Sequence, residues 1–230
     1  MAAPMTLRIV AISDTHSGHG NVMLPDADVL VHTGDYCKYG HMSEVRDLAK
    51  WMGRLSHKHK VAIAGNHDKA VEKRTSEARE IFKAAGVTLL INEGVTIEGV
   101  KFWGSPFTPT FFDWSFMLDR GPDIKKIWDQ IPDDVDVLLT HGPPYGHGDL
   151  CPPYHTQQRK VAGCMDLLIK IREIHQRSNQ KHPKLHIFGH IHDGYGATQS
   201  DQFPGLTFIN ASTCTEAYKP TNPPILVELR

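Results

Sequence analysis

Five short runs of mostly apolar residues constrain the fold of this chain more than any other feature. The runs are LRIVAIS (7–13), DVLVHT (28–33), KVAIAG (60–65), DVDVLLT (134–140) and KLHIFG (184–189). Near-continuous apolar runs of this length are typical of β-strands that are covered on both faces. The runs therefore predict the interior strands of an α/β fold.

Amphipathic helix patterns lie between these runs. Residues 43–56 repeat apolar side chains at steps of three and four, and Ser43 is a natural N-cap for them. The same spacing predicts a helix over 76–85, which Gly86 would end. Two further helices are predicted over 122–131 and 159–177.

Other strand patterns suggest antiparallel additions to this core. Residues 87–105 have Glu93-Gly94 and Glu98-Gly99 at expected turns, which predicts successive hairpin strands. LTFINAS (206–212) and PILVELR (224–230) also read as strands. Because no repeat, low-complexity tract or linker interrupts the chain, we expect a single domain over residues 1–230.

Composition argues against several classes of protein. A net charge of -1 makes long nucleic acid a poor partner, although it leaves room for a local positive pocket. The four cysteines form no C-x-x-C pair, which favours reduced thiols. The N-terminus lacks a signal-peptide pattern, and no stretch is long enough to span a membrane. We therefore expect a cytoplasmic protein with no membrane partner.

Potential ligand residues follow each of the five apolar runs. They are, in order, Asp14 and His16; Asp35; Asn66, His67 and Asp68; His141; and His190 and His192. Each motif alone has an ordinary explanation, since aspartates cap helices and form turns, and histidines occur in loops. Sites in α/β sheets form beyond the carboxyl ends of the strands, however, so five such motifs at one edge favour a shared site.

The residue types indicate the metal chemistry of that site. Carboxylate, imidazole and amide groups without a thiolate disfavour a structural zinc site. Nitrogen and oxygen ligands suit divalent Mn, Fe, Zn or Co. Even seven of these nine residues would be too many ligands for one catalytic ion with an open position, and seven suit two ions roughly 3.5–4 Å apart with a bridging carboxylate.

The motifs DTH, GD, GNHD, THGPP and GHIH, in this order, resemble the five blocks of the calcineurin-like metallophosphoesterase superfamily. HTGDYCKYG, GSPFTPTFFDWSF, LHIFGHIHDGYG and NASTCTEAYKPTNPPI are similar to one subgroup, the metallophosphoesterase-domain-containing proteins related to class III cyclic-nucleotide phosphodiesterases. The resemblance runs from about Leu7 to the C-terminus. It implies a layered αββα sandwich of mixed sheets with helices outside.

The resemblance also implies a role for each residue at the strand ends. Two divalent ions would be held by Asp14, His16 and His192 at the first position and by Asn66, His141 and His190 at the second, with Asp35 bridging them. His67 would be free to meet the substrate. The third block reads GNHD where many relatives have glutamate, which leaves the role of Asp68 open. Some members of the subgroup lack the histidine that matches His190, so its presence predicts a complete second position.

These roles predict a dinuclear phosphoester hydrolase, most simply a phosphodiesterase acting on small or cyclic-nucleotide substrates. A hydroxide between the metals and beside Asp35 would attack phosphorus, and His67 would protonate the leaving group. His67 could instead be a structural histidine that holds its loop. The alternative functions are a protein phosphatase, a nuclease or a catalytically silent metal-binding scaffold, and the complete ligand set argues against the scaffold.

Two further segments could contribute to the substrate pocket. The first contains Trp103, Phe107, Phe111, Phe112, Trp114 and Phe116. Its aromatic side chains would either pack beneath a long loop or form a wall beside the metals that stacks on a planar group. The second contains Tyr145, His147, Tyr154 and His155. Cys37 is expected to be a buried thiol, and the sequence leaves the oligomeric state open.

Overall fold

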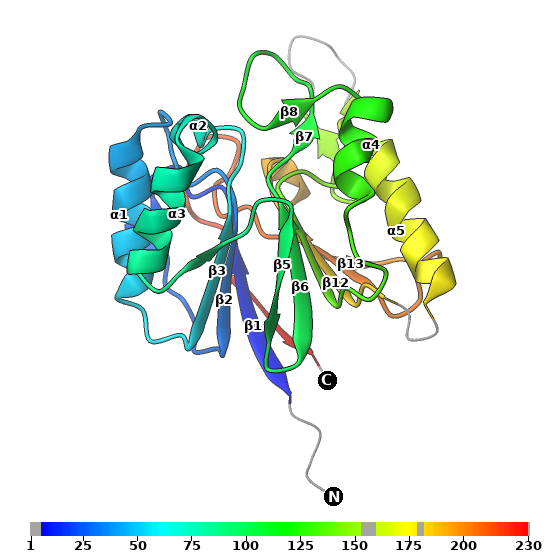
Figure 1. Cartoon of the computed structure of the whole chain (residues 1–230), viewed down its shortest axis with the longest axis horizontal. Helices are drawn as coiled ribbons and strands as arrows, with labels where there is room; N and C mark the ends of the chain where they lie inside the picture. Colours follow the sequence, from blue (N-terminus) through cyan, green and yellow to red (C-terminus); the bar gives the residue numbers. More distant parts are fainter. Residues whose placement is uncertain (1–5, 153–159, 179–181, 230) are drawn as a thin grey trace, which may run out of the picture.

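Two β-sheets face each other and carry helices on their outer faces (Figure 1). The computed structural model describes residues 6–152, 160–178 and 182–229. The arrangement confirms the expected α/β class and the layered sandwich of mixed sheets with helices outside. Within the described residues, no helix combines the length and the apolar character that crossing a membrane requires.

The first sheet is built mainly from the N-terminal part of the chain. In order across the sheet, its strands are β15 (Ile225–Leu229), β1 (Leu7–Ile12), β2 (Val29–Thr33), β3 (His59–Ile63) and β4 (Thr88–Leu89). The strands β1 to β4 run parallel, and β15 pairs with β1 in the antiparallel direction. The first three predicted strands are therefore parallel neighbours whose carboxyl ends lie at one edge.

The second sheet contains the other two predicted interior strands. In order across the sheet, its strands are β13 (Gly196–Gln199), β14 (Thr207–Asn210), β12 (Leu185–Phe188), β9 (Val137–Thr140), β6 (Val100–Ser105) and β5 (Glu93–Ile97). The four central strands are parallel, and the two edge strands are antiparallel to their neighbours. Two smaller pairs are β7 (Thr108–Pro109) with β8 (Met117–Leu118), and β10 (Leu150–Cys151) with β11 (Lys160–Val161).

The alternation of side chains along each strand produces three apolar layers. In β1, Ile9 and Ala11 point between the sheets and pack in one cluster with Val137 and Leu139 of β9. The intervening residues of β1 point to the outer face, in the cluster that includes residues of the N-terminal helices. Because both faces of the central strands are covered, these strands read as continuous apolar runs in the sequence.

Helices α1 (Met42–Gly53) and α3 (Thr75–Ala84) cover the first sheet, and α4 (Pro122–Trp128) and α5 (Met165–Arg177) cover the second (Figure 1). The short helix α2 (Lys69–Lys73) and the 3-10 turns η1 (His19–Asn21) and η2 (His192–Gly194) follow strand ends. All four predicted helices are present, with differences at their ends. Gly86 follows α3 with a φ of 70°, as a helix-ending glycine should.

Several predicted helix boundaries were wrong. The N-cap of α1 is His41 rather than Ser43, because the Glu44 carboxylate accepts the His41 N–H at 2.8 Å and sets the start earlier. Helix α4 ends at Trp128, since residues 130 and 131 tighten into i to i+3 hydrogen bonds. Helix α5 begins only at Met165, because residues 160 and 161 pair with β10 instead. Arg159 lies outside the described residues.

The predicted hairpins between residues 87 and 105 are only partly present. Glu98 and Gly99 form a tight turn between β5 and β6, with φ values of 49° and 83°. Glu93-Gly94 is not a turn but the beginning of β5. The strand before it, β4, pairs with β3 in the first sheet, so the chain crosses from one sheet to the other there.

Candidate metal centre

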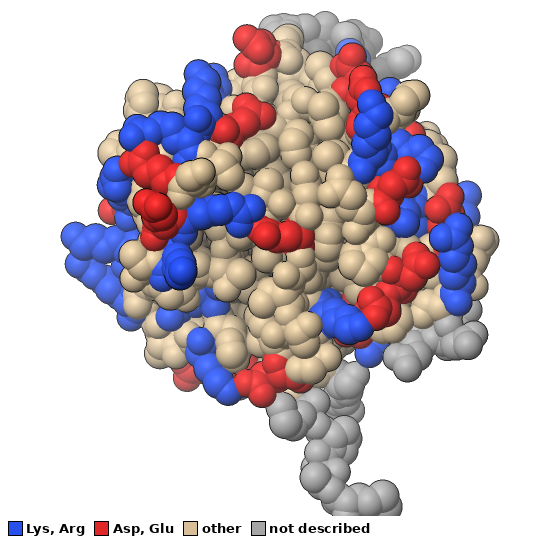
Figure 2. Space-filling model, in the orientation of Figure 1, with Lys and Arg blue, Asp and Glu red and all other residues tan. Residues whose placement is uncertain are grey.

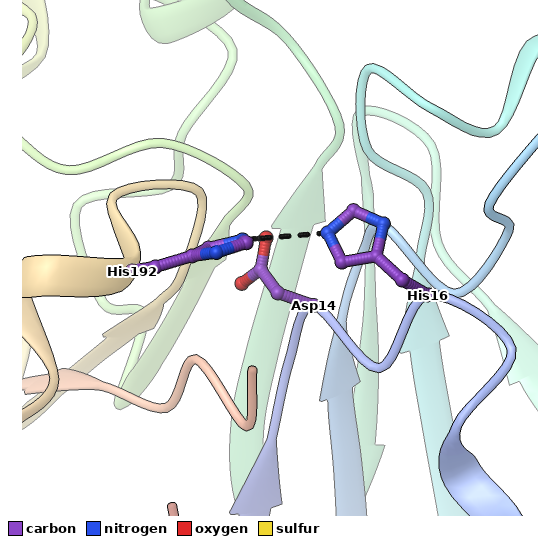
Figure 3. A group of neighbouring side chains, drawn as sticks. All are labelled: Asp14, His16 and His192. Atoms are coloured by element: carbon purple, nitrogen blue, oxygen red, sulfur yellow. Dashed lines mark hydrogen bonds and ion pairs between the residues drawn. The ribbon is translucent and has the colours of Figure 1, made fainter. Parts of the chain in front are cut away.

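The predicted ligand residues come together where the strands of the two sheets end. Asp14, Asp35 and Asn66 follow β1, β2 and β3 of the first sheet, and His141 and His190 follow β9 and β12 of the second. Three groups of side chains have ligand atoms within 4.8 Å of one another: Asp14, His16 and His192; His16, Asp35 and His67; and Asp35, His141 and His190. Figure 3 shows the first group, in which both imidazoles point toward the carboxylate.

His190 and His192 are two residues apart in sequence but belong to different groups. The 3-10 turn η2 begins at His192 and turns its ring toward Asp14, whereas the ring of His190 lies 5.0 Å from that of His141. Asp35 is shared by two of the groups. His16 is likewise shared, by the first and second groups, so His16 and Asp35 together connect the three groups. The bridging role of Asp35 stays a prediction.

Unusual backbone conformations concentrate at these residues. Asp14, His16, Asp35 and His190 all have positive φ values, of 51°, 41°, 54° and 67°. Non-glycine residues rarely adopt this conformation, and it persists only where the surrounding structure enforces it. The strain at four of the predicted ligands indicates that the loops are shaped to aim their side chains.

Two glycines allow the loops to pack against the ligand groups. A Cβ atom at Gly65 would lie 2.3 Å from Asp35 Oδ1, and one at Gly189 would lie 2.1 Å from Asp14 Oδ2. Neither distance is sterically possible. The glycines of the GNHD and GHIH motifs are therefore required by the close approach of backbone and carboxylate.

Backbone carbonyls orient three of the imidazoles. The Nδ1 atoms of His16, His141 and His192 lie 3.2, 2.9 and 3.0 Å from the carbonyl oxygens of Cys37, Thr33 and Thr215. Since a carbonyl oxygen can only accept, each ring must donate its Nδ1–H and present the Nε2 lone pair to the cluster. This is the arrangement by which outer residues commonly fix metal-binding histidines.

The resulting set of atoms fits a cation. The Nε2 atoms of His16 and His192 are 3.3 Å apart, and Asp14 Oδ1 lies 3.6 Å from His192 Nε2. Asp14 Oδ1 is buried and receives no hydrogen bond within the described part of the chain, whereas Oδ2 accepts one from Ser212 Oγ at 2.8 Å. Acceptors that face one another in this way are unfavourable unless a proton or a metal ion lies between them.

The second group repeats this convergence around His141. Its Nε2 atom lies 3.0 Å from Asn66 Oδ1 and 3.3 Å from Asp35 Oδ1. Burial lowers the pKa of His141, but the charge of Asp35 more than offsets this and raises the pKa to about 9. A proton can therefore take the central position when no cation is bound. The donor set of carboxylate, imidazole and amide oxygen suits a divalent metal ion there.

The two buried carboxyl groups are held in their charged form. Burial raises the pKa of Asp14, but the hydrogen bond and charge of His192 lower it well below its usual range. Burial acts on Asp35 in the same direction, and the charge and hydrogen bond of His141 lower its pKa below the usual range as well. Both side chains are thus available as anionic ligands near neutral pH.

Asp68 supports the loops that carry these ligands. Its carboxylate accepts the backbone N–H groups of Asp35, Cys37 and Gly65 at 2.9, 2.9 and 2.7 Å. Although Asp68 stands at the N-cap position of α2, its side chain makes no capping hydrogen bond there. Burial and the Asp35 charge raise the pKa of Asp68 to about 8, and the N–H donors oppose that rise. The role left open by the sequence is therefore to join the loops after β2 and β3.

The ring of His67 lies near two aromatic side chains at the edge of the cluster. The Trp114 ring is 4.4 Å from it, and the Tyr218 ring is 6.5 Å away (centroid distances). Tyr218 also contacts His16 at 4.8 Å and His192 at 5.4 Å, and its φ is 55°. No sequence pattern predicted a role for Tyr218, although it belongs to the NASTCTEAYKPTNPPI string.

The predicted aromatic segment divides between the core and the site. Trp103 and Phe116 are buried among core residues, so they do not form a wall beside the cluster. Trp114 contacts His67, and Phe111, which is half exposed, lies 6.3 Å from the His190 ring. Of the six predicted aromatic residues, Trp114 and Phe111 therefore have ring contacts with imidazoles of the cluster.

The segment that contains Tyr145 and His147 contributes less to the surroundings of the cluster. His147 stacks on Phe208 of β14 at 3.9 Å, so its ring packs against the second sheet. Tyr145 is exposed, and Tyr154 and His155 lie outside the described residues. Cys37 is buried as expected, and its carbonyl oxygen, rather than its thiol, takes part in the site by accepting from His16.

Comparisons with known proteins show which sequences and structures this chain is similar to. The profile of the calcineurin-like phosphoesterase family matches residues 7–194. The chain is 37% identical to human metallophosphoesterase domain-containing protein 1, and the match covers 98% of this chain and 72% of that protein. It is 35% identical to a UPF0046 protein of Caenorhabditis elegans, covering 97% and 81%.

A crystal structure of a protein from Thermus thermophilus resembles the fold with a TM-score of 0.58 at 12% identity, covering 90% of this chain and 89% of that one. A likeness at such low identity concerns the fold alone. The family is therefore established by the sequence matches.

Proposed function

Since this chain belongs to the calcineurin-like phosphoesterase family, we propose that it is a phosphodiesterase which hydrolyses small phosphoesters with two divalent metal ions. The carrying observation is the convergence of imidazole Nε2 atoms and carboxylate oxygens from both sheets, within 4.8 Å of one another in each group. Asp35 shares one group with His16 and another with His141 and His190, and it is the proposed bridge.

Divalent ions at these positions would acidify a bound water and neutralise the phosphoryl oxygens. The chain supplies the remaining chemistry. Asp14 and Asp35 contribute the buried negative charge that holds the ions, while His16, His141 and His192 contribute oriented lone pairs. Asn66 adds a neutral oxygen beside His141.

His67 is the proposed proton donor to the leaving oxygen. Its Nδ1–H donates to the Lys38 carbonyl oxygen at 3.3 Å, which leaves Nε2 as the position that faces the substrate. Nε2 lies 4.0 Å from Asp35 Oδ2, and the side chain is partly exposed. In that position an Nε2–H could donate its proton to a leaving oxygen, as a general acid does.

The positions of Trp114 and Tyr218 favour a small substrate that contains a planar group. Each ring packs against an imidazole of the cluster, and each remains partly accessible. Rings in this position limit the space above the site and offer faces for stacking. Charged side chains of both signs are interspersed over the face in Figure 2, which lacks the continuous basic surface of a nuclease for long polymers.

The test is hydrolysis of bis-p-nitrophenyl phosphate by the purified chain with Mn²⁺, compared with chelator-treated protein. We expect turnover only in the presence of a divalent ion. Asp35→Asn should lose both bound metal and activity, whereas Asp26→Asn, a matched change at an exposed aspartate, should keep both. Tight metal binding without turnover for any divalent ion would favour the silent scaffold, and full metal content in Asp35→Asn would contradict the bridge.

A further inference from the structure

A cavity lies between the start of α1 and α2, on the outer side of the first sheet. Its volume is about 330 Å³, and its lining includes Tyr39, His41, Lys69, Lys73 and Arg74. The start of α1 forms one wall and α2 forms the other. Figure 1 shows α2 at the end of the molecule where β1 carries the chain toward the ligand loops.

The lining of this cavity is positively charged. Three of its residues are Lys or Arg, and none is Asp or Glu. Glu77 pairs with Arg74 and also with Arg46. Within the described part of the chain, no carboxylate forms an ion pair with Lys69 or Lys73. A chain with a net charge of -1 thus carries a locally cationic cavity.

Two nearby glutamates are engaged with backbone groups. Glu44 Oε1 accepts the Lys38 N–H at 2.7 Å, and its Oε2 accepts the His41 N–H at 2.8 Å. Glu72 Oε1 accepts the Phe116 N–H at 2.7 Å, from the loop after β7. Neither carboxylate forms an ion pair with Lys69 or Lys73 among the described residues, so the two ammonium groups can bind another anion.

The walls of the cavity are continuous with the candidate metal centre. The Lys69 N–H donates to the His67 carbonyl oxygen at 2.9 Å, and the Ala70 N–H donates to the Gly40 carbonyl oxygen at 3.1 Å. The first bond is a turn within the loop that carries His67, and the second joins the start of α2 to the segment that follows Asp35. In addition, Lys69 Nζ lies 4.5 Å from the centroid of the Trp114 ring, which contacts His67.

Resting on the proposed function, we propose that this cavity binds a second phosphate group of the substrate, so that the preferred substrates are phosphoesters that carry a further phosphate. Lysine and arginine side chains bind phosphate through charge and through several N–H donors. The exposed ring of Tyr39 offers a face to the part of the substrate between the two phosphates. Free inorganic phosphate should occupy the same cavity and compete.

The experiment compares two chromogenic esters that differ by one phosphate. These are thymidine 5′-p-nitrophenyl phosphate and its 3′-phosphorylated form, each assayed with the Mn²⁺-loaded protein. We expect kcat/KM to be about ten-fold higher for the 3′-phosphorylated ester, mainly through KM, since a hydrogen bond between charged groups contributes a factor of this order. The preference should decrease as NaCl is raised, because salt screens exposed charges.

Lys73→Gln should reduce this preference, and Lys69→Gln combined with Lys73→Gln should bring the ratio of the two kcat/KM values close to one. Lys83→Gln, at an exposed lysine of α3, is the matched control and should keep the wild-type ratio. An equal ratio in wild type and in both cavity variants, with both esters hydrolysed, overturns this inference and leaves the proposed function intact.

Calorimetry with two ligands that are not hydrolysed measures phosphate binding in the cavity independently of catalytic activity. Thymidine 3′,5′-bisphosphate should bind the wild type about ten-fold more tightly than thymidine 5′-monophosphate, and Lys73→Gln should lose most of this difference. Should this pattern hold while neither ester is hydrolysed, the cavity stands as a phosphate site and the phosphodiesterase proposal fails. Equal affinities in the wild type overturn the phosphate site itself.

Discussion

His67 differs from the other imidazoles of the cluster in what surrounds its Nε2 atom. Nε2 of His16 and of His141 lies within 3.3 Å of another acceptor, whereas Nε2 of His67 is 4.0 Å from Asp35 Oδ2. The backbone N–H of His67 donates to Asp35 Oδ1 at 2.7 Å, which anchors the residue through its main chain. The side chain can therefore be removed without losing this anchor, and its absence should affect catalysis more than metal binding.

For His67→Ala we predict normal metal content and a turnover reduced by about a hundred-fold or more on an ester with a poor leaving group. The loss should be smaller on a p-nitrophenyl ester, because nitrophenolate leaves without needing a proton. Steady-state kinetics on the two esters and elemental analysis of the variant provide the measurement. Unchanged turnover on the poor leaving group would rule out the proton-donor role.

Asp68 accepts three backbone N–H groups, so its replacement should affect both stability and metal binding. An asparagine keeps the shape but has one acceptor oxygen in place of two, and it brings an NH₂ group toward backbone donors. Asp68→Asn should lower the free energy of unfolding by about 1–3 kcal/mol, the usual effect of leaving buried donors unsatisfied. It should also weaken Mn²⁺ binding, since Asp35 would lose the backbone bond that positions it.

Urea unfolding and metal titration of the variant test this prediction, with Asp119→Asn as the control at an exposed aspartate. Wild-type stability together with wild-type Mn²⁺ affinity in Asp68→Asn would show that the junction of the two loops does not depend on this carboxylate.

At the level of elements, the parallel pair β9 and β12 contains a buried polar contact. Thr140 donates its hydroxyl to the Gly142 carbonyl oxygen at 2.7 Å, so its oxygen must accept from His186 Nε2 at 2.8 Å. The proton of His186 is therefore on Nε2. Its buried Nδ1 has no partner in the described part of the chain. Protonating Nδ1 would place an unpaired charge in the core, and this burial lowers the pKa of His186 to about 3.

This contact predicts a loss of stability in mild acid. Because the folded-state pKa is lowered, the unfolded chain binds a proton first, and stability falls as the pH drops below the ordinary histidine value of about 6.5. The contribution of His186 should reach about 2 kcal/mol at pH 5. His186→Gln, which keeps a donor but does not titrate, should therefore lose less stability than wild type between pH 7 and pH 5. An identical loss in both proteins, measured by urea unfolding, would contradict this account.

For the whole molecule, the important property is that the proposed metal positions lie between the sheets. Asp14 and His16 follow strand β1 of the first sheet, whereas their partner His192 follows β12 of the second. Asp35 likewise comes from the first sheet, and its partners His141 and His190 come from the second. A cation at either position would therefore link the two sheets as well as serve catalysis.

Removing the metal should accordingly lower the melting temperature. At a Mn²⁺ concentration about a hundred times the dissociation constant, binding adds about 2.7 kcal/mol to stability. For a chain of this length, that corresponds to a shift of about 5–10 °C between chelated and Mn²⁺-loaded protein. Asp35→Asn should show a much smaller shift than Asp26→Asn in the same thermal scan. Equal melting temperatures of the wild type with and without metal would exclude a cation between the sheets.

Short stretches of sequence were sufficient to predict the interior strands and to identify the polar residues at their ends. The runs 7–13, 28–33 and 60–65 became β1, β2 and β3 because apolar continuity and β-branching act within a few residues. Polar residues that directly follow an apolar run can also be recognised within a short stretch of sequence. Asp14, Asp35 and His141 could therefore be identified as candidate ligands. Parallel strands of one sheet end at the same edge, which made the convergence of Asp14 and Asp35 predictable. The expectation of one edge was wrong for His141, which follows β9 of the second sheet.

Tertiary packing determined which aromatic residues contact the cluster and which sheet each strand joins. Tyr218 approaches His16 because the segment after β14 pairs with the chain after β1, where the Thr213 N–H donates to the Ser13 carbonyl oxygen. Trp103 lies in strand β6 and is buried in the core, whereas Trp114 lies between β7 and β8 and contacts His67. The separation of β4 from β5 into different sheets has the same origin. Residue chemistry and strand periodicity are short-range properties, and the sequence determined them. Contacts between the sheets depend on how distant segments fill one shared volume, so only the folded structure could determine them.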